Sequence, residues 1–390
     1  MDFRLSPGAE EFRAEVRAFL ASAMTPALEE QIYRTGVSDD EGFTRALVER
    51  GWFAPEWPAA TGGQDRSPME VVALDEELQR FDAPLYLSET TRMVAALVQQ
   101  VGTPALQERI VGPALRGELT IALGFTEPSC GSDVAAARTR AVRDIDADGG
   151  GWVIDGQKMF TTNGHVADYV FLLARTNPDV PKHRGLTMFL VPTSTPGVDV
   201  QALFTLSGER TNITFYADVR IPDELRVGDV DGGWSVMALS LQDEHTSGWG
   251  QHLARLLETA EAWARDDDGS DPPPIERTEV RRRLARIAAE VEIAQLLERR
   301  GHWMADEGIA ARAEGPMSKL YSTEALQRAA DDVLDLVGPE GLRSRFVEGA
   351  VQDGRFEHFV RFAQGTTIYA GTSEVQRGII GQHGLGLPRG

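Results

Sequence analysis

Apolar residues recur at intervals of three and four along the first 118 residues, the spacing of one helix face. Ser6 followed by Pro7 predicts an N-cap and a first helical position. Phe12, Val16 and Leu20 then supply the apolar face of that helix. Further helices are predicted around Phe43–Val48, Leu78, Leu97 and Leu106–Leu115, with an irregular loop at Pro55–Pro68.

The pattern changes near residue 118, where short stretches rich in β-forming residues replace the helical spacing. Strands are predicted at Leu119–Leu123, Ala141–Ile145, Gly151–Ile154, Tyr169–Leu173, Leu186–Val191, Val198–Leu203 and Asn212–Phe215. The polar run Asp146–Gly150 predicts a hairpin between the second and third of these. Consecutive strands without intervening helices favour a small barrel or a sandwich.

Helical spacing returns at Gly233 and continues nearly to the end of the chain. A polar, proline-rich stretch from Asp266 to Pro274 interrupts it. The fold class is therefore predicted to be α+β and mostly α. The predicted domains are helical at residues 1–118, β at 119–230 and helical at 231–390.

Composition and charge exclude several classes of protein for this chain. The 390 residues carry a formal net charge of −21, which repels phosphate backbones, so nucleic-acid binding is not expected. The start of the chain lacks the pattern of a signal peptide, and no apolar stretch is long enough to span a bilayer. Cys130 is the single cysteine, so we expect a cytoplasmic protein without disulfides or membrane association. No histidine, cysteine or carboxylate pattern has a metal-ligand spacing, so no metal site is expected.

The segment Gly124–Asp133 is the richest in candidate chemistry. It follows a predicted strand, and glycines such as Gly131 let backbone amides approach an anion. Thr126 and Ser132 add hydroxyl donors, so this loop could bind a pyrophosphate together with the polar edge of a ring. A polar turn at a strand end is the alternative, which the residues alone favour.

A second candidate segment is Lys158–Asp168. Phe160 and Thr162 are two positions apart, so they would share one side of a predicted strand. The phenylalanine could then stack on a flat cofactor while the threonine bonds to its edge. A core aromatic beside an ordinary strand threonine is the alternative.

The third candidate segment, Ile368–Arg377, predicts a loop that enters a helix. Thr372 or Ser373 is the expected N-cap, and the backbone amides after Gly371 suit a phosphate. A simple helix start is the alternative.

Together these segments resemble the acyl-CoA dehydrogenase family, over nearly the whole chain. Each motif is weak alone, but their order and spacing over about 250 residues make chance agreement very improbable. The motifs are Phe125–Pro128 with Gly131–Asp133, Thr162–Gly164 with Ala167–Asp168, Ala174–Thr176, Val219–Pro222, Gly232–Trp234, and Gly371–Glu374 with Gln376–Arg377.

The resemblance implies an N-terminal helical domain, a middle β-barrel and a C-terminal four-helix bundle. It implies α,β-dehydrogenation of an acyl-CoA thioester to the trans-2-enoyl-CoA, with electrons passed to an electron-transfer flavoprotein. It also implies bound FAD. The residues implied to contact FAD are Phe125, Thr126, Gly131, Ser132, Phe160, Thr162, Gly371, Thr372 and Glu374.

The reaction needs a base for the Cα proton, and a carboxylate serves if a dry site raises its pKa toward neutrality. Many relatives hold this glutamate immediately before Gly-Thr-Ser, where this chain has Ala370. Isovaleryl- and long-chain-type relatives instead supply it from the first helix of the last domain. That helix here carries one stripe through Trp234, Met237, Leu241, Glu244 and Gly248. Glu244 is therefore the predicted base, and a stripe-edge glutamate paired with an arginine is the alternative.

Two segments depart from the family pattern. Asp267–Pro274 replaces an Arg-x-x-Phe-Gly stretch that reaches the partner subunit's FAD, and Val337–Gly341 replaces a glycine-rich turn. The expected assembly is thus a homodimer, a homotetramer or a heteromer with a paralogous subunit. Two alternative functions stay open: a non-catalytic or FAD-poor subunit of a heteromer, and a flavoenzyme acting on carrier-protein thioesters. The acyl group is also open: straight, branched or ring-bearing.

Overall fold

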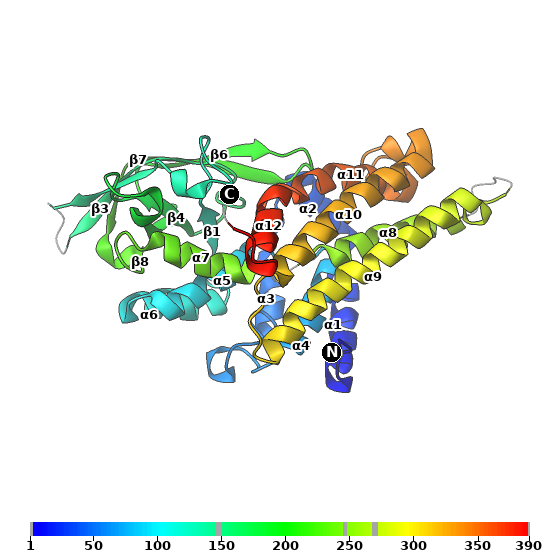
Figure 1. Cartoon of the computed structure of the whole chain (residues 1–390), viewed down its shortest axis with the longest axis horizontal. Helices are drawn as coiled ribbons and strands as arrows, with labels where there is room; N and C mark the ends of the chain where they lie inside the picture. The colour runs from blue at the N-terminus through cyan, green and yellow to red at the C-terminus, as the bar shows by residue number, and fades with distance from the viewer. Residues whose placement is uncertain (1–2, 146–149, 245–247, 267–271, 389–390) are drawn as a thin grey trace. The chain divides into compact units, whose positions relative to one another are not determined.

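The computed structural model describes residues 3–145, 150–244, 248–266 and 272–388, and only the backbone at 240–244. The chain forms two compact units, each assembled from separate stretches of sequence (Figure 1). The helical unit combines Met1–Thr25, Ser67–Ala83 and Glu244–Gly390. The sheet unit combines Pro26–Arg66 and Pro84–Asp243.

The helical unit consists of long helices joined by short connections. Its helices are α1 (Pro7–Ala23), α4 (Pro68–Arg80), α8 (Gly250–Arg265), α9 (Thr278–Asp306), α10 (Glu314–Val337), α11 (Arg355–Thr366) and α12 (Ser373–Ile379). Ser6 caps α1 as predicted, because its Oγ accepts the N–H of Ala9 at 3.2 Å.

The core of the helical unit lies among α8, α9, α10 and α11. Each helix contributes an apolar stripe at helical spacing, such as Leu253, Leu256, Ala260 and Ala264 on α8. Phe356 and Phe359 of α11 are buried in the same cluster. These stripes explain why the four helices pack together, as the predicted C-terminal bundle requires.

The sheet unit begins with helices and continues into strands. Its helices are α2 (Pro26–Thr35), α3 (Glu41–Glu49), α5 (Tyr86–Val101), α6 (Pro104–Leu115) and α7 (Gly233–Glu244), the last residue of which belongs to the helical unit. Its strands are β1 (Ile121–Gly124), β2 (Arg140–Asp144), β3 (Gly151–Lys158), β4 (Tyr169–Arg175), β5 (Leu186–Pro192), β6 (Val198–Phe204), β7 (Arg210–Pro222) and β8 (Arg226–Val227).

The described strands form one sheet in the order β6-β7-β3-β2-β4-β5-β8, with β1 parallel to β4. β4 and β5 pair antiparallel, and each is mostly apolar because its central residues are buried on both faces. Two threonines attach α5 to the start of β1: Thr90 Oγ1 donates to the Ile121 carbonyl at 2.7 Å, and Thr91 Oγ1 accepts the Ile121 N–H at 2.8 Å. This attachment positions the loop that follows β1.

The predicted order of helical, β and helical segments is confirmed. β2 and β3 form the predicted antiparallel pair, while residues 146–149 of its turn lie outside the described residues. The helix α2 and the two-residue strand β8 were not predicted. Among the described residues, no helix is both long enough and apolar enough to cross a membrane. The domain bounds 1–118, 119–230 and 231–390 stay a prediction.

Candidate functional site

Two of the predicted FAD-contacting segments lie side by side in the sheet unit. The N–H of Met159 donates to the carbonyl of Thr126 over 2.8 Å. Gly131 approaches the same threonine, since a Cβ at position 131 would lie 4.0 Å from Thr126 Cγ2. The structure therefore places Thr126 and Gly131 close to the residues that lead into Phe160, as a shared site requires.

A buried ion pair fixes these two segments together. Lys158 is fully buried at the end of β3, and its Nζ donates to Glu127 Oε1 at 2.8 Å and to the Phe125 carbonyl at 3.2 Å. Glu127 also accepts the N–H groups of Arg138 and Thr139, at 2.7 and 2.9 Å. Burial raises the pKa of Glu127, but the charge and hydrogen bond of Lys158, together with the two backbone hydrogen bonds, hold the pKa below its usual value. This pair shapes the loop from which Phe125 and Thr126 project.

The prediction that Phe160 and Thr162 share one side of a strand is wrong. β3 ends at Lys158, and Phe160 has a φ of 58° in the left-handed region. Asn163, the middle residue of the Thr-Asn-Gly turn, has a φ of 56°, which asparagine tolerates better than most residues. The turn leaves Phe160 54% exposed. Phe160 is therefore an exposed aromatic on an uncommon backbone conformation and not a core residue.

The other predicted residues of the sheet unit have ordinary local contacts. Phe125 is half-buried and packs edge-on against Phe171, with ring centroids 5.9 Å apart. Thr162 Oγ1 lies 3.2 Å from the hydroxyl of Thr211. Ser132 is exposed on the loop after β1. Nothing in these contacts prevents the three side chains from meeting a ligand.

In the helical unit, the loop before α12 is held in an uncommon backbone conformation. Ala370 has a φ of 52° and Gly371 a φ of 81°. Lys319, almost fully buried on α10, donates to the Gly371 carbonyl at 2.6 Å. Gln376 Nε2 donates to the Ala370 carbonyl at 2.8 Å. The loop is therefore clamped from α10 and α12 around the residue that replaces the usual glutamate.

The prediction of a helix start after Gly371 is confirmed. Thr372 is the N-cap of α12, and its Oγ1 accepts the N–H of Val375 at 3.3 Å. Glu374 is exposed in the first turn, and hydrogen bonds from its own N–H and from the Thr372 hydroxyl lower its pKa. Its carboxylate is thus available at the surface of this loop.

The predicted base, Glu244, is the last residue of α7, and only its backbone is described. The backbone of α7 ends at Glu244, but the Glu244 side chain and residues 245–247 lie outside the described residues. Along the predicted stripe, Met237 is buried and Trp234 half-buried. The two stripe positions on the first half of α7 therefore both face away from solvent, at least in part.

The prediction that this helix continues through Gly248 is wrong. Gly248 lies in an irregular link before α8. Its N–H donates to Glu298 Oε1 at 3.2 Å, and the N–H of Trp249 donates to Ser322 Oγ at 3.1 Å. In a continuous helix, the Gly248 N–H would donate to the carbonyl of Glu244. Side chains of α9 and α10 thus accept the N–H groups that backbone carbonyls would accept in a continuous helix. Glycine at position 248 favours the end of the helix, because glycine is a poor helix former.

The sequence reasoning missed Glu127, Lys158, Lys319 and Glu298. The two lysines gave no signal in the local sequence, because each one binds a residue that is distant in the chain and comes near only on folding. Glu298 did give one, since Leu284, Ile287, Val291 and Ala294 lead to it at helical spacing on the buried face of α9.

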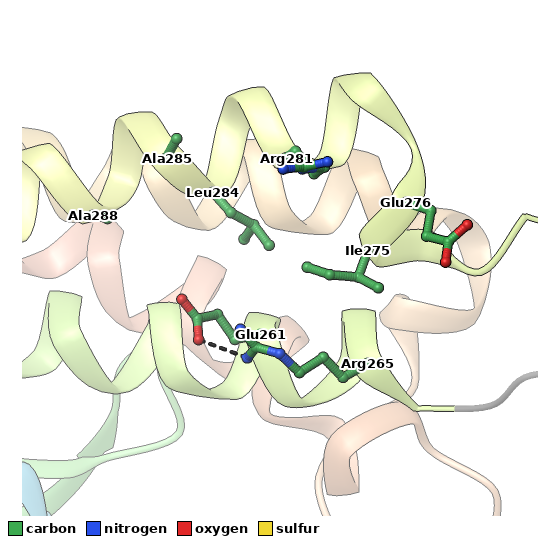
Figure 2. A pocket seen from close by; sticks show the side chains of 8 residues that line it. All are labelled: Glu261, Arg265, Ile275, Glu276, Arg281, Leu284, Ala285 and Ala288. Atoms are coloured by element: carbon green, nitrogen blue, oxygen red, sulfur yellow. Dashed lines mark hydrogen bonds and ion pairs between the residues drawn. The ribbon is translucent and has the colours of Figure 1, made fainter.

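A surface pocket lies between α8 and α9, beside the short turn that holds Ile275 and Glu276 (Figure 2). Its lining residues are Glu261, Arg265, Ile275, Glu276, Arg281, Leu284, Ala285 and Ala288. Arg265 and Glu261 pair across one turn of α8 at 2.8 Å. None of the predicted site residues lines this pocket, so it is separate from the candidate site.

The whole chain matches a known family. Sequence models of the N-terminal, middle and C-terminal domains of acyl-CoA dehydrogenases match residues 6–118, 122–219 and 231–385. The acyl-CoA dehydrogenase FadE26 of Mycobacterium tuberculosis is 32% identical over 406 residues, which cover 100% of this chain and 99% of that protein. The chain belongs to the acyl-CoA dehydrogenase family. It is an oxidoreductase, and the members of this family are flavoproteins.

Solved structures of acyl-CoA dehydrogenases have the same fold. A structure described as the Tcur3481-Tcur3483 steroid ACAD is 33% identical, with a TM-score of 0.91 and full coverage of both chains. The ChsE4-ChsE5 complex from Mycobacterium tuberculosis is 31% identical, with a TM-score of 0.88 and the same coverage. Both descriptions name two components.

Proposed function

We propose that the chain catalyses FAD-dependent α,β-dehydrogenation of an acyl-CoA thioester to the trans-2-enoyl-CoA, with Glu244 as the base for the Cα proton. One observation carries the placement of the base. In the helical unit, Trp249 packs against Tyr369, with ring centroids 6.0 Å apart. Trp249, five positions after Glu244, therefore contacts the loop in which many relatives hold their glutamate.

Chain geometry limits how far Glu244 can lie from that contact. Gly248 comes four positions after Glu244 in the chain, and an extended chain spans at most about 14 Å over four residue steps. Gly248 is itself fixed to α9, and Trp249 to α10. The helix end that bears Glu244 is thus tied to the neighbourhood of Ala370, whose methyl group cannot accept a proton.

The residues of the sheet unit fit FAD. Thr126 and Gly131 approach each other on the loop after β1. Phe160 is exposed and directly follows Met159, whose N–H bonds to the Thr126 carbonyl. The buried pair of Lys158 and Glu127 holds the two segments in register. Bound FAD supplies the acceptor for the hydride that leaves Cβ of the substrate.

The chain's own groups then act on the thioester. Glu244 removes the Cα proton as the general base. Backbone donors near Ala370, Gly371 and Thr372 polarise the thioester carbonyl, which favours the enolate-like charge that develops as the proton leaves. The clamped loop conformation supplies the fixed geometry on which such donors depend.

We propose a bulky, ring-bearing acyl group as the substrate class. One similar structure is described as a steroid ACAD, and a relative 29% identical from Geobacter metallireducens is a cyclohex-1-ene-1-carbonyl-CoA dehydrogenase. That alignment covers 86% of this chain and 87% of the relative. A base on α7 in place of residue 370 also changes the shape of the acyl pocket, which suits a wide substrate.

We further propose a heteromer with a paralogous subunit and electron transfer to an electron-transfer flavoprotein. The acidic Asp267–Pro274 segment, in place of the usual partner-contacting stretch, supports the heteromer. The two-component descriptions of the similar structures support it as well.

The same segments favour a second candidate function, that of a non-catalytic or FAD-poor subunit. A visible spectrum of the purified chain, alone and with its paralogue, separates the two candidates. A folded but colourless chain in both preparations would support the scaffold. A yellow protein that contains FAD supports the enzyme.

The proposed reaction is tested with the yellow protein and a panel of butyryl-, palmitoyl-, isovaleryl-, cyclohexanoyl- and steroid-side-chain-CoA. We expect bleaching of the flavin by at least the ring-bearing thioester. A protein that is bleached only by carrier-protein thioesters would have a different substrate class, and one bleached by none would not be the proposed dehydrogenase.

A further inference from the structure

Glu298 lies in the interior of the helical unit, at a position where an apolar side chain is the norm. Glu298 is 5% exposed on α9. It continues the buried stripe of Ile287, Val291 and Ala294 at spacings of four, three and four. Glutamate is almost never fully buried unless it is paired, so this position needs an explanation.

The hydrogen-bonding partner of Glu298 is Gly248, four positions after Glu244 in the chain. Glu298 Oε1 accepts the Gly248 N–H at 3.2 Å, and Ser322 Oγ of α10 accepts the next N–H, that of Trp249, at 3.1 Å. Two consecutive backbone amides are therefore held by side chains of two different helices. Trp249 continues the contact to Tyr369.

Glycine at 248 permits this close approach. A Cβ there would lie 2.6 Å from Ser318 Oγ and 3.1 Å from Glu298 Oε2. These two oxygens are buried, and neither meets a hydrogen-bonding partner among the residues that the structure describes. The second oxygen of the carboxyl group and the serine hydroxyl thus both face the same glycine.

Among the residues that the structure describes, no basic side chain forms an ion pair with Glu298. The neighbouring Arg299 binds Glu76 of α4 instead, at 2.8 and 3.1 Å. Burial raises the pKa of Glu298 to about 8, against the lowering effect of the Gly248 hydrogen bond. The carboxylates of Glu76 and Asp75 raise it further and Arg299 opposes them. The raised pKa favours the neutral carboxylic acid at pH 7.

We propose that Glu298 is a positioning residue for the dehydrogenase reaction: by holding the Gly248 amide from α9, it fixes the segment that carries the base Glu244. The inference rests on the proposed function. A negative charge at this position would have to be hydrated, which would loosen the Gly248–Trp249 segment. Activity should therefore decline at alkaline pH because Glu298 ionises, although Glu298 does not itself contact the substrate.

Three variants test this role in the FAD-loaded protein. Glu298→Gln keeps an acceptor for the Gly248 N–H but carries no charge, so the decline of kcat above pH 8 should disappear while kcat at pH 7 stays within about threefold. Glu298→Ala removes the acceptor, and kcat should fall on the order of tenfold to a hundredfold with a smaller change in KM. Glu292→Gln, an exposed glutamate of the same helix, should keep the wild-type profile.

The outcomes separate this inference from the proposed function. An alkaline decline unchanged in Glu298→Gln, or a kcat of Glu298→Ala equal to wild type, would overturn the positioning role even where Glu244 proves to be the base. Bound FAD and the circular dichroism spectrum identify a variant that has failed to fold. If Glu298→Ala fails in that way, the pH profile of Glu298→Gln decides alone.

Discussion

The buried Glu298 makes stability depend on pH in a way that a surface glutamate does not. Its folded-state pKa is raised from 4.5 to about 8, so the unfolded chain releases this proton at lower pH than the folded chain. Below pH 4.5 both states are protonated and nothing is lost. Between pH 4.5 and 8 the unfolded state binds fewer protons, and the free energy of unfolding falls as the pH rises.

The expected size follows from the two pKa values. Between pH 5 and pH 7, Glu298 loses its proton in the unfolded chain but keeps it in the folded one. This difference should lower the free energy of unfolding by roughly 2–3 kcal/mol. Glutamine at this position has no proton to release, so Glu298→Gln should gain stability over wild type by that amount as the pH rises from 5 to 7. Because the side chain is 5% exposed, solvent screening reduces the effect little.

The assay is urea unfolding followed by tryptophan fluorescence at pH 5, 6 and 7, with wild type, Glu298→Gln and Glu292→Gln in parallel. The difference between wild type and Glu298→Gln should widen with pH, whereas Glu292→Gln should run parallel to wild type. If the Glu298→Gln curve also ran parallel to wild type, Glu298 would ionise normally in the folded protein, and its neutrality at pH 7 would be refuted.

Two other predictions concern the loops of the candidate site. Lys158→Met leaves the Glu127 carboxylate buried without its cation, which should cost about 3–5 kcal/mol in unfolding free energy and release FAD. Adding Glu127→Gln should recover much of that stability, and a double variant no more stable than the single one would contradict the pairing. Gly371→Ala places a Cβ 2.7 Å from Gln376 Nε2 at a φ of 81°, and should cost about 1–2 kcal/mol by thermal unfolding. An unchanged melting temperature would show that the loop is not clamped as described.

Much of the fold could be predicted because the signals are local. The apolar runs of β4 and β5 and the helical stripe of α8 appear in the sequence at the period of the element they form. The N-cap roles of Ser6 and Thr372 depend on neighbours three residues away, so they too could be predicted.

The errors arose where a turn or a distant side chain overrode the local pattern. Phe160 and Thr162 alternate like strand residues, yet the left-handed conformation of Asn163 belongs to a turn beyond the end of β3. Gly248 falls on the stripe of α7, yet Glu298, fifty positions later, captures its amide. Such contacts form only in the folded chain, so the spacing of residues within one segment could not predict them.

The central claim is that Glu244 removes the Cα proton. Its direct test is the rate of flavin reduction in an anaerobic stopped-flow experiment with a ring-bearing acyl-CoA, comparing wild type, Glu244→Gln and the adjacent control Asp243→Asn. We expect Glu244→Gln to keep its FAD and its fold but to lose on the order of a thousandfold in rate, because general-base catalysis contributes factors of this size. Asp243→Asn should bleach at close to the wild-type rate. Bleaching of Glu244→Gln at the wild-type rate would contradict the account, since the proton would then leave through another group.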